Sequence, residues 1–225
     1  MLQLESVHKQ FATKVLLEGA TAHLRPGARV GLVGPNGAGK TTLFRMILGE
    51  ESPDKGTIRK RPRLRVGYLP QELETIVGKT VLDATHRDLY PEHEAERILA
   101  GLGFSEADFS RPIENLSGGY RMRVALAHLL LSNPDVLMLD EPTNHLDKPT
   151  QRWFERFLLD SNLTLLVISH DTKFLDGIAT HIWELRDRTI QEYRGNYTKF
   201  QELRAARDAQ IESAASAPQE AVGTG

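Results

Sequence analysis

Residues 34–41 read GPNGAGKT and fit the spacing G-x-x-x-x-G-K-[ST]. They lie between the apolar run ARVGLVG, which predicts a buried strand, and KTTLFRMILG, which has a helical period. Glycines let successive backbone N–H groups turn toward one anion, and the helix start adds partial positive charge. This context favours a nucleotide-binding loop over a chance glycine-rich turn.

Each residue of this loop has an expected task. Lys40 should reach the β- and γ-phosphates, the Thr41 hydroxyl should ligate Mg²⁺, and Thr42 should assist on the α-phosphate side. The residues expected to bind the nucleotide are Gly34, Pro35, Asn36, Gly37, Ala38, Gly39, Lys40, Thr41 and Thr42.

Two adjacent acids follow a second apolar run, DVLMLDE, at residues 135–141. Asp140 ends a predicted parallel strand, where ligands of such sheets bind, and it should hold Mg²⁺, through water. Glu141 is one residue further, so it points differently and could polarise an attacking water. The alternative is two acids on a solvated strand end, which the nearby phosphate loop makes much less attractive.

A second glycine-rich helix start occurs at residues 116–120, LSGGY. Ser117, Gly118 and Gly119 would form another anion site, because a serine and two glycines precede a strongly helical stretch. A plain N-cap with a glycine turn is the alternative reading. One nucleotide does not need two such sites from one domain, so the function of the second site requires a partner.

Composition restricts the class of protein. The chain has 225 residues, a formal net charge of -2 and no cysteine, so disulfides and thiolate metal sites are excluded. No apolar run approaches the ~20 residues of a membrane span, and the start has no secretory pattern, so we expect a cytoplasmic protein. The charge balance gives no global reason to expect nucleic-acid binding, although it permits a local basic patch.

Apolar strands alternate with helices along the chain, which predicts an α/β fold: a P-loop core with a largely parallel sheet. We expect an antiparallel β part near the N-terminus and a small helical subdomain. The ATPase-like domain should cover residues 1–200, and the helical subdomain with the LSGGY segment about 78–132. Residues 201–225 should begin a linker helix and end in a disordered tail.

Several motifs together resemble those of ABC-type ATPase domains. GPNGAGKTT, LPQ, LSGGYRMRVALA, LMLDEPTNHLD and ISHD occur in the order typical of that family, over about residues 1–200. The resemblance implies an enzyme that hydrolyses ATP to ADP and phosphate with Mg²⁺. It also implies that two domains sandwich two ATP molecules, with Ser117, Gly118 and Gly119 of one domain covering the γ-phosphate held by the other.

The resemblance assigns four further residues. Phe11 matches an aromatic that stacks on adenine, and Gln71 matches a glutamine that senses Mg²⁺ and the attacking water. His170 matches a switch histidine near the γ-phosphate, and Asp147 matches an acid that crosses the dimer interface. The alternatives are a core aromatic, a solvated glutamine, a structural histidine and an N-cap for the helix near Lys148.

The sequence EPTNHLD is similar to that of the ABC-F class, soluble proteins with two such domains in one chain. ISHDTKFLD and RGNYTKFQELRAAR are also similar, the latter to the start of the ABC-F interdomain linker. This resemblance implies action at the ribosome, with rRNA and tRNA as partners of the full-length protein. The alternatives are the ATP-binding subunit of a membrane transporter, with a membrane subunit as its partner, and a non-translational ABC ATPase.

The chain departs from the ABC-F pattern in three respects. It contains one domain, the interval between residues 71 and 116 is short for the arm that some members carry, and the linker helix gives way to a polar tail. We therefore expect a fragment cut at the linker, in preference to a half-size protein that pairs with itself or with another half. In either case we expect the second ABC domain to lie outside this sequence.

Overall fold

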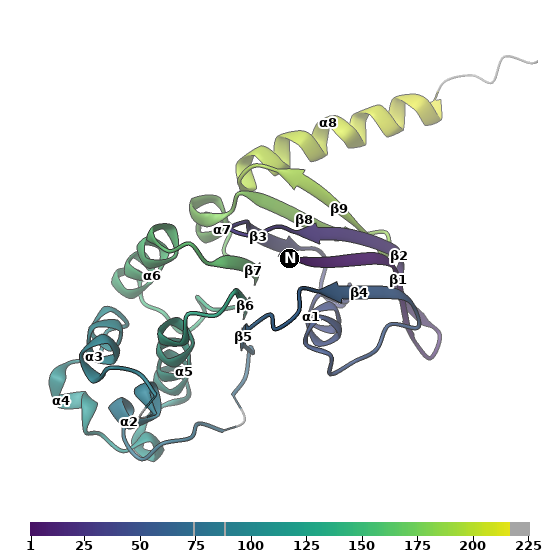
Figure 1. Ribbon diagram of the computed structural model, residues 1–225. Coiled ribbons are helices and arrows are strands. Elements are labelled where there is room, and N and C mark those ends of the chain that lie inside the picture. The colour runs from purple at the N-terminus through teal and green to yellow at the C-terminus, as the bar shows by residue number, and fades with distance from the viewer. Residues whose placement is uncertain (74, 88, 217–225) are drawn as a thin grey trace, which may run out of the picture.

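A computed structural model describes residues 1–73, 75–87 and 89–216 as two sheets with helices around them (Figure 1). The smaller sheet is antiparallel and has the strand order β2-β1-β4. Every second or third residue of β1 is buried, which places one face of this sheet on the core. Its strands are β1 Leu2–Phe11, β2 Lys14–Leu24 and β4 Lys55–Lys60.

The larger sheet has six strands in the order β5-β6-β7-β3-β8-β9. The first five are parallel, and β9 runs antiparallel to β8 after a two-residue turn. Both turn residues, Asp187 and Arg188, have positive φ (50° and 65°), as tight hairpins require. The strands are β3 Arg29–Val33, β5 Val66–Leu69, β6 Val136–Asp140, β7 Thr164–Ile168, β8 His181–Arg186 and β9 Thr189–Arg194.

Helices cover both faces of the larger sheet. The sheet itself divides the hydrophobic core into two parts. Along β6, Val136 and Met138 join the core under α1 and the antiparallel sheet, whereas Leu137 and Leu139 join the core under the other helices. The longer helices are α1 Lys40–Leu48, α3 Glu92–Gly101, α5 Gly118–Ser132, α6 Lys148–Asp160 and α8 Tyr197–Ser216. The shorter ones are α2 Val81–His86, α4 Glu106–Phe109, η1 Ile113–Asn115 and α7 Thr172–Ile178.

The α/β fold class is confirmed, including the antiparallel part near the N-terminus and a group of helices, α2 to α5, that pack at one end of the molecule (Figure 1). Helix α4 and η1 were not predicted, because four and three residues are too short to show a period. The helix predicted from residue 201 is present as α8, which begins four residues earlier, at Tyr197. The predicted disordered tail, residues 217–225, lies outside the described residues.

The packing of α3 on α6 generates a stability prediction. A Cβ atom added at Gly101, the last residue of α3, would lie 1.9 Å from the Trp153 ring of α6. Gly101→Ala should therefore lower the free energy of unfolding by about 1–3 kcal/mol through overpacking. Urea unfolding monitored by Trp fluorescence measures this change.

Gly177→Ala is the matched control, because Gly177 lies in α7 and an added Cβ would meet nothing closer than Glu155 at 4.0 Å. This substitution should raise the free energy of unfolding by about 0.5–1 kcal/mol, since alanine favours the helix. Equal stability of the Gly101 variant and the parent would contradict the described contact.

Candidate functional site

The loop between β3 and α1 has a backbone that its glycines permit. Gly37 has a φ of 71° and Gly39 a φ of 110°, both in the left-handed region that favours glycine. A Cβ at Gly34 would lie 2.5 Å from the Leu185 carbonyl oxygen, so the loop also needs glycine where it passes close to β8. The loop leads directly into α1, as a phosphate site requires.

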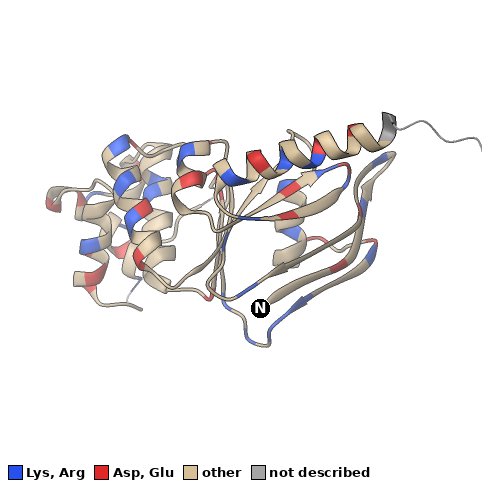
Figure 2. Cartoon of the chain, turned by 90° about the horizontal axis from the view of Figure 1, so that it is seen from above, with Lys and Arg blue, Asp and Glu red and all other residues tan. Residues whose placement is uncertain are grey.

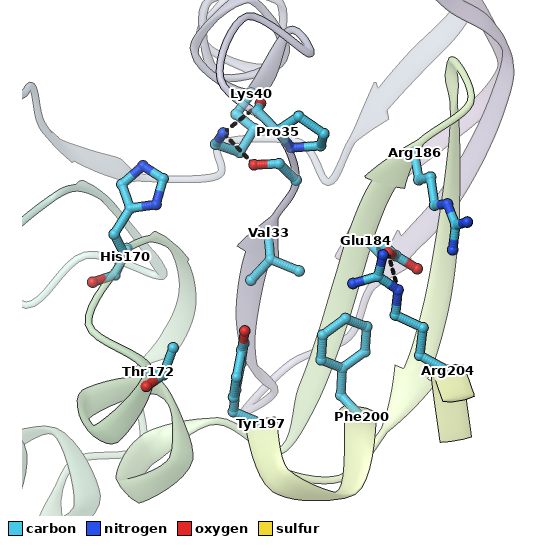
Figure 3. Close-up of a pocket in the computed structure, with 12 residues that line it drawn as sticks. Val33, Pro35, Lys40, His170, Thr172, Glu184, Arg186, Tyr197, Phe200 and Arg204 are labelled. Atoms are coloured by element: carbon cyan, nitrogen blue, oxygen red, sulfur yellow. Dashed lines mark hydrogen bonds and ion pairs between the residues drawn. The ribbon is translucent and has the colours of Figure 1, made fainter. Parts of the chain in front are cut away.

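Lys40 is the first residue of α1, and its ammonium lies inside this loop. Its Nζ donates hydrogen bonds to the carbonyl oxygens of Gly34 at 2.8 Å and Pro35 at 3.0 Å (Figure 3). Burial lowers the pKa of Lys40, and the nearby charges of Glu141 and Asp140 oppose that shift. The cation is therefore held inside the loop by contacts that an anionic ligand can replace.

Asp140 joins the end of β6 to the start of α1. The Thr41 hydroxyl donates to Asp140 Oδ2 at 3.2 Å, and the carboxylate is almost fully buried. Burial raises the pKa of Asp140, whereas the hydrogen bond from Thr41 and the charges of Lys40 and His170 lower it. The two oxygen-bearing side chains that the sequence assigned to one metal thus lie together.

Glu141 has an unusual backbone for a non-glycine residue, with a φ of 52°. This conformation directs its buried side chain toward His170, whose backbone N–H donates to Glu141 Oε2 at 3.2 Å. The His170 Nε2 atom is 3.4 Å from Oε1, yet Oε1 has no hydrogen-bond partner among the described residues. Burial also raises the pKa of Glu141, so the site holds a buried carboxyl group that is more basic than an exposed glutamate and has one oxygen without a hydrogen-bond donor.

A cavity of about 640 Å³ brings most of the predicted residues together. Phe11 lies at this cavity and is 46% exposed, so the alternative reading of a core aromatic is wrong. The predicted residues that line the cavity are Phe11, Asn36, Gly37, Gly39, Lys40, Thr41, Thr42, Gln71, Asp140, Glu141 and His170.

The remaining predicted residues lie elsewhere. Ala38 packs against the core beneath α1, and Pro35 faces the adjoining cavity. Ser117 caps α5 by accepting from the Tyr120 N–H at 3.4 Å, and Asp147 caps α6 by accepting from the Thr150 N–H at 3.3 Å. The N-cap readings of Ser117 and Asp147 are thus correct, and the start of α5, with Gly118 and Gly119, is not part of the cavity wall.

Four lining residues were not predicted: Lys14, Leu16, Asn144 and Ile168. Lys14 and Leu16 lie on β2, and only the fold brings this strand beside the phosphate loop. Asn144 was visible in the sequence as part of TNH, but its position in the cavity depends on the turn that follows Glu141. For Ile168, the strand end that precedes Ser169 and His170 was the available signal.

A second cavity, of about 310 Å³, lies behind the phosphate loop (Figure 3). Lys40 and His170 border it on one side, and Tyr197, Phe200 and Arg204 of α8 border it on the other. The buried Glu184 of β8 accepts from Arg204 Nε at 3.0 Å and from the Tyr193 hydroxyl at 3.2 Å. A buried carboxylate therefore anchors α8 next to the candidate site.

The geometry places a glycine-rich loop, a lysine, two buried acids and a histidine around one cavity, which is the arrangement the sequence motifs predict. A family model described as ABC transporter matches residues 17–144, more than half of the chain. The chain belongs to the ABC transporter family. It is an ABC-type ATPase domain, an ATP-binding cassette.

Among the relatives of this ABC domain, two proteins of Arabidopsis thaliana carry the F-family name. ABC transporter F family member 2 of Arabidopsis thaliana is 33% identical over 88% of this chain and 36% of its own length. The probable ATP-binding protein YheS of Escherichia coli K12 is 35% identical over 99% of this chain and 40% of its own length. The uncharacterized ABC transporter ATP-binding protein YfmR of Bacillus subtilis is 34% identical over 94% of this chain and 40% of its own length.

These figures show that the ABC domain spans about 40% of the length of such relatives. The alignment with YheS extends over 259 residues, which exceeds the 225 residues of this chain. The aligned part of YheS therefore contains residues that this chain lacks.

Solved structures share the fold of this ABC domain. The ATP binding subunit of an ABC transporter superposes with a TM-score of 0.77 at 20% identity, over 94% of this chain and 98% of that one. A dimeric post-hydrolysis state of the ATP-binding cassette MJ0796, bound to ADP and Pi, gives a TM-score of 0.74 at 23% identity, over 86% and 98%. Within residues 1–73, 75–87 and 89–216, no helix is long and apolar enough to cross a membrane.

The buried carboxylate of Glu141 in this ABC domain predicts a pH-dependent stability. Because burial raises the pKa of Glu141 in the folded state, its ionised form destabilises the fold. This penalty is absent below the unfolded pKa of about 4.3, grows as the pH rises through the raised folded pKa, and is constant above it. Glu141→Gln should therefore gain stability over the parent as the pH rises from about 4.5, measured by urea unfolding without nucleotide.

Glu92→Gln is the control for this pH series, because the Glu92 side chain is exposed at the start of α3. Its stability relative to the parent should change much less between pH 4.5 and pH 8. A Glu141→Gln advantage that does not vary with pH would show that burial of the charge is not a cost to the fold.

Proposed function

We propose that this domain binds ATP in the 640 Å³ cavity and hydrolyses it when a second ABC domain closes over the nucleotide. The main support for this proposal is Glu141 Oε1. This oxygen is buried beside the phosphate loop and has no hydrogen-bond donor among the described residues. A buried carboxylate oxygen without a donor is costly for the fold, and an attacking water would satisfy it.

The phosphate loop supplies the binding half of this function. Backbone N–H groups of residues 36–39 and the start of α1 surround the phosphates, and Lys40 exchanges its two loop carbonyls for the β- and γ-phosphates. The exposed Phe11 ring, with Lys9 Nζ 4.9 Å from its centroid, offers a stacking face for adenine at the same cavity.

Oxygen donors from the end of β6, the start of α1 and the segment after β5 fit Mg²⁺. The Thr41 hydroxyl and Asp140 Oδ2 are 3.2 Å apart, and the Gln71 side chain lines the same cavity, so a set of hard oxygen ligands is available. When bound with ATP, Mg²⁺ neutralises charge on the phosphate oxygens. The burial that raises the pKa of Asp140 indicates a carboxylate that gains stability when a cation is bound.

Glu141 supplies the water-activating half. The His170 N–H occupies Oε2, which leaves Oε1 to accept the proton of a water that attacks the γ-phosphorus. The water oxygen forms the new P–O bond while the bond to the ADP oxygen breaks. The raised pKa makes Glu141 a stronger base than an exposed glutamate, and the His170 ring at 3.4 Å from Oε1 lies beside the reacting group.

The second ABC domain supplies what this cavity lacks. Ser117, Gly118 and Gly119 begin α5 outside the cavity, so we propose that they cover the γ-phosphate of a nucleotide held by the partner domain. The dimeric, ADP- and Pi-bound cassette of MJ0796 supports such a pairing, as does the greater length of the relatives. In this proposal residues 78–132 form the helical subdomain, Asp147 faces the partner, and residues 201–225 begin the linker.

For the full-length protein we propose cytoplasmic action at the ribosome, with rRNA and tRNA as partners. The F-family relatives support this, because the ABC-F class resembles the chain in its EPTNHLD segment. A local feature adds support: five of the seven residues 59–65 are Lys or Arg. This basic segment lies beside the N-terminus, where blue segments gather in Figure 2.

The basic segment keeps an excess of positive charge. Arg59 pairs with Glu5 at 3.2 Å and Arg61 with Asp135 at 3.3 Å, whereas Lys60 and Arg63 form no ion pair with the described residues. Arg63 also holds a φ of 57°, a left-handed backbone conformation that is unfavourable for a non-glycine residue. Exposed cations that are not neutralised internally suit a phosphate backbone.

A membrane transporter's ATP-binding subunit is the second candidate, with a membrane subunit as its partner. The observation that favours it is the TM-score of 0.77 with the ATP binding subunit of an ABC transporter. Co-purification of the full-length protein with an integral membrane protein would favour this candidate over ribosome association.

Glu141→Gln tests the catalytic proposal. Because Gln cannot accept the proton, steady-state ATP hydrolysis should fall by at least about 10²-fold, while ATP binding is retained and a closed dimer accumulates. Phosphate release and sedimentation velocity with ATP-Mg²⁺ measure the two effects. Lys40→Ala is the companion variant, since it should lose ATP binding itself; turnover by Glu141→Gln at the parent rate would remove Glu141 from the mechanism.

Co-sedimentation of the full-length protein with ribosomes tests the translational proposal. Lys60→Gln combined with Arg63→Gln should weaken binding and reduce its salt dependence, because two phosphate contacts are lost. Arg97→Gln with Arg156→Gln makes the same charge change on exposed residues of α3 and α6 and should leave binding unchanged. Absence of the parent protein from the ribosome pellet in ATP would contradict the proposal.

A further inference from the structure

Arg123 is a buried cation outside the cavity. It lies on α5, one helical turn after Gly119, so both residues are on the same side of the helix. Its side chain is only 11% exposed. The nearest carboxylate, Asp147 Oδ1, is 3.8 Å from Nη2 and belongs to a side chain that is 62% exposed. The ion pair is therefore too loose and too wet to explain why a charge is buried here.

The guanidinium instead binds two main-chain carbonyl groups from different parts of the fold. Nε donates to the His145 oxygen at 2.9 Å, and Nη1 donates to the Leu102 oxygen at 3.2 Å. Its carbon is 5.0 Å from the centroid of the Tyr120 ring, so the cation also lies over the aromatic residue that follows the serine-glycine segment. Three segments thus meet on one side chain.

The surroundings are shaped to this side chain. A Cβ at Gly103 would lie 2.9 Å from Arg123 Nη1, and the φ of 87° at Gly103 also favours glycine. Only a planar, forked donor can serve two carbonyl oxygens and an aromatic face together. A lysine in its place can reach one carbonyl oxygen.

The segment that Arg123 holds lies on the start of α5. The His145 ring is 3.6 Å from the position of a Cβ at Gly119. The same segment is also hydrogen-bonded to the residues that precede it. The Asn144 N–H donates to the Glu141 carbonyl oxygen at 3.3 Å, and the Leu146 N–H donates to the Thr143 carbonyl oxygen at 3.1 Å. A compact turn therefore joins the water-activating glutamate to the surface of α5.

We propose that Arg123 is a positioning residue that holds residues 144–147 against residues 116–120, so that both segments meet the partner domain as one rigid surface. This inference rests on the proposed function, in which residues 117–119 and Asp147 face that partner. It adds a physical connection: the segment that follows Glu141 of one site also sets the position of the serine-glycine segment that serves the other site.

The first test uses hydrogen–deuterium exchange on the 225-residue chain without nucleotide. Arg123→Gln should speed exchange at the Asn144 and Leu146 amides by about tenfold, because a charge-assisted hydrogen bond to the segment is lost. Arg123→Lys should give an intermediate rate, since one carbonyl can still be bound. Unchanged exchange in Arg123→Gln overturns the proposal whether or not the domains pair.

The second test places the same substitutions in the Glu141→Gln parent and measures ATP-dependent dimerisation by sedimentation velocity. Arg123→Gln should weaken dimerisation at least tenfold but leave the affinity of the monomer for a fluorescent ATP analogue within about threefold, because the cavity does not contain Arg123. Partial rescue by Lys separates positioning from general destabilisation. Dimerisation equal to that of the parent overturns the proposal.

Arg121→Gln is the matched control, because Arg121 is exposed two residues earlier on the same helix. It should change neither amide exchange in residues 144–147 nor dimerisation. If the Glu141→Gln parent itself does not dimerise with ATP, the proposed dimer closure fails, and the exchange data still decide whether Arg123 holds the segment.

Discussion

The burial of two adjacent carboxylates at the end of β6 is the constraint on which the rest of this domain depends. Asp140 and Glu141 are both nearly inaccessible, and desolvation raises the pKa of each. The fold tolerates them only because Thr41, Lys40 and the His170 backbone lie within reach. Thr41 and Lys40 belong to α1, and His170 follows the end of β7. The strand order that places β7 between β6 and β3 therefore brings together the groups that stabilise the two buried carboxylates.

That strand order also explains which parts of the fold and of the candidate site could be predicted from the sequence. Runs such as VLMLD and TLLVI are buried on both faces, and a phosphate loop after β3 implies a ligand at the carboxyl ends of parallel strands. Fold class, the cavity and most of its lining residues follow from these local patterns. The roles of Gln71, His170 and Phe11 came from family resemblance, and the shared cavity agrees with them without testing those roles.

The rest could not be predicted because it arises from distant contacts. No local pattern shows that Lys14 and Leu16 of β2 reach the phosphate loop, or that Glu141 adopts a left-handed backbone. Arg123 reads as one more cation on a helix, and only the approach of residues 102 and 145 reveals its task. Phe11 shows what pattern reasoning alone lacks: an aromatic in a strand is usually core, and only the family resemblance pointed to an exposed ring at the cavity.

The residues between Glu141 and Asp147 carry a consequence for cooperativity. Asn144 lines the cavity of its own domain, and its neighbour His145 lies over Gly119 on the surface assigned to the partner. Two internal hydrogen bonds, from the Asn144 N–H to the Glu141 oxygen and from the Leu146 N–H to the Thr143 oxygen, couple the ends of this turn. If partner closure shifts His145, the Glu141 backbone must respond, and thermodynamic linkage requires the reverse. In the proposed pair of domains, this turn would then couple the ATP affinities of the two sites. Arg123, which holds the turn against α5, would set the strength of that coupling.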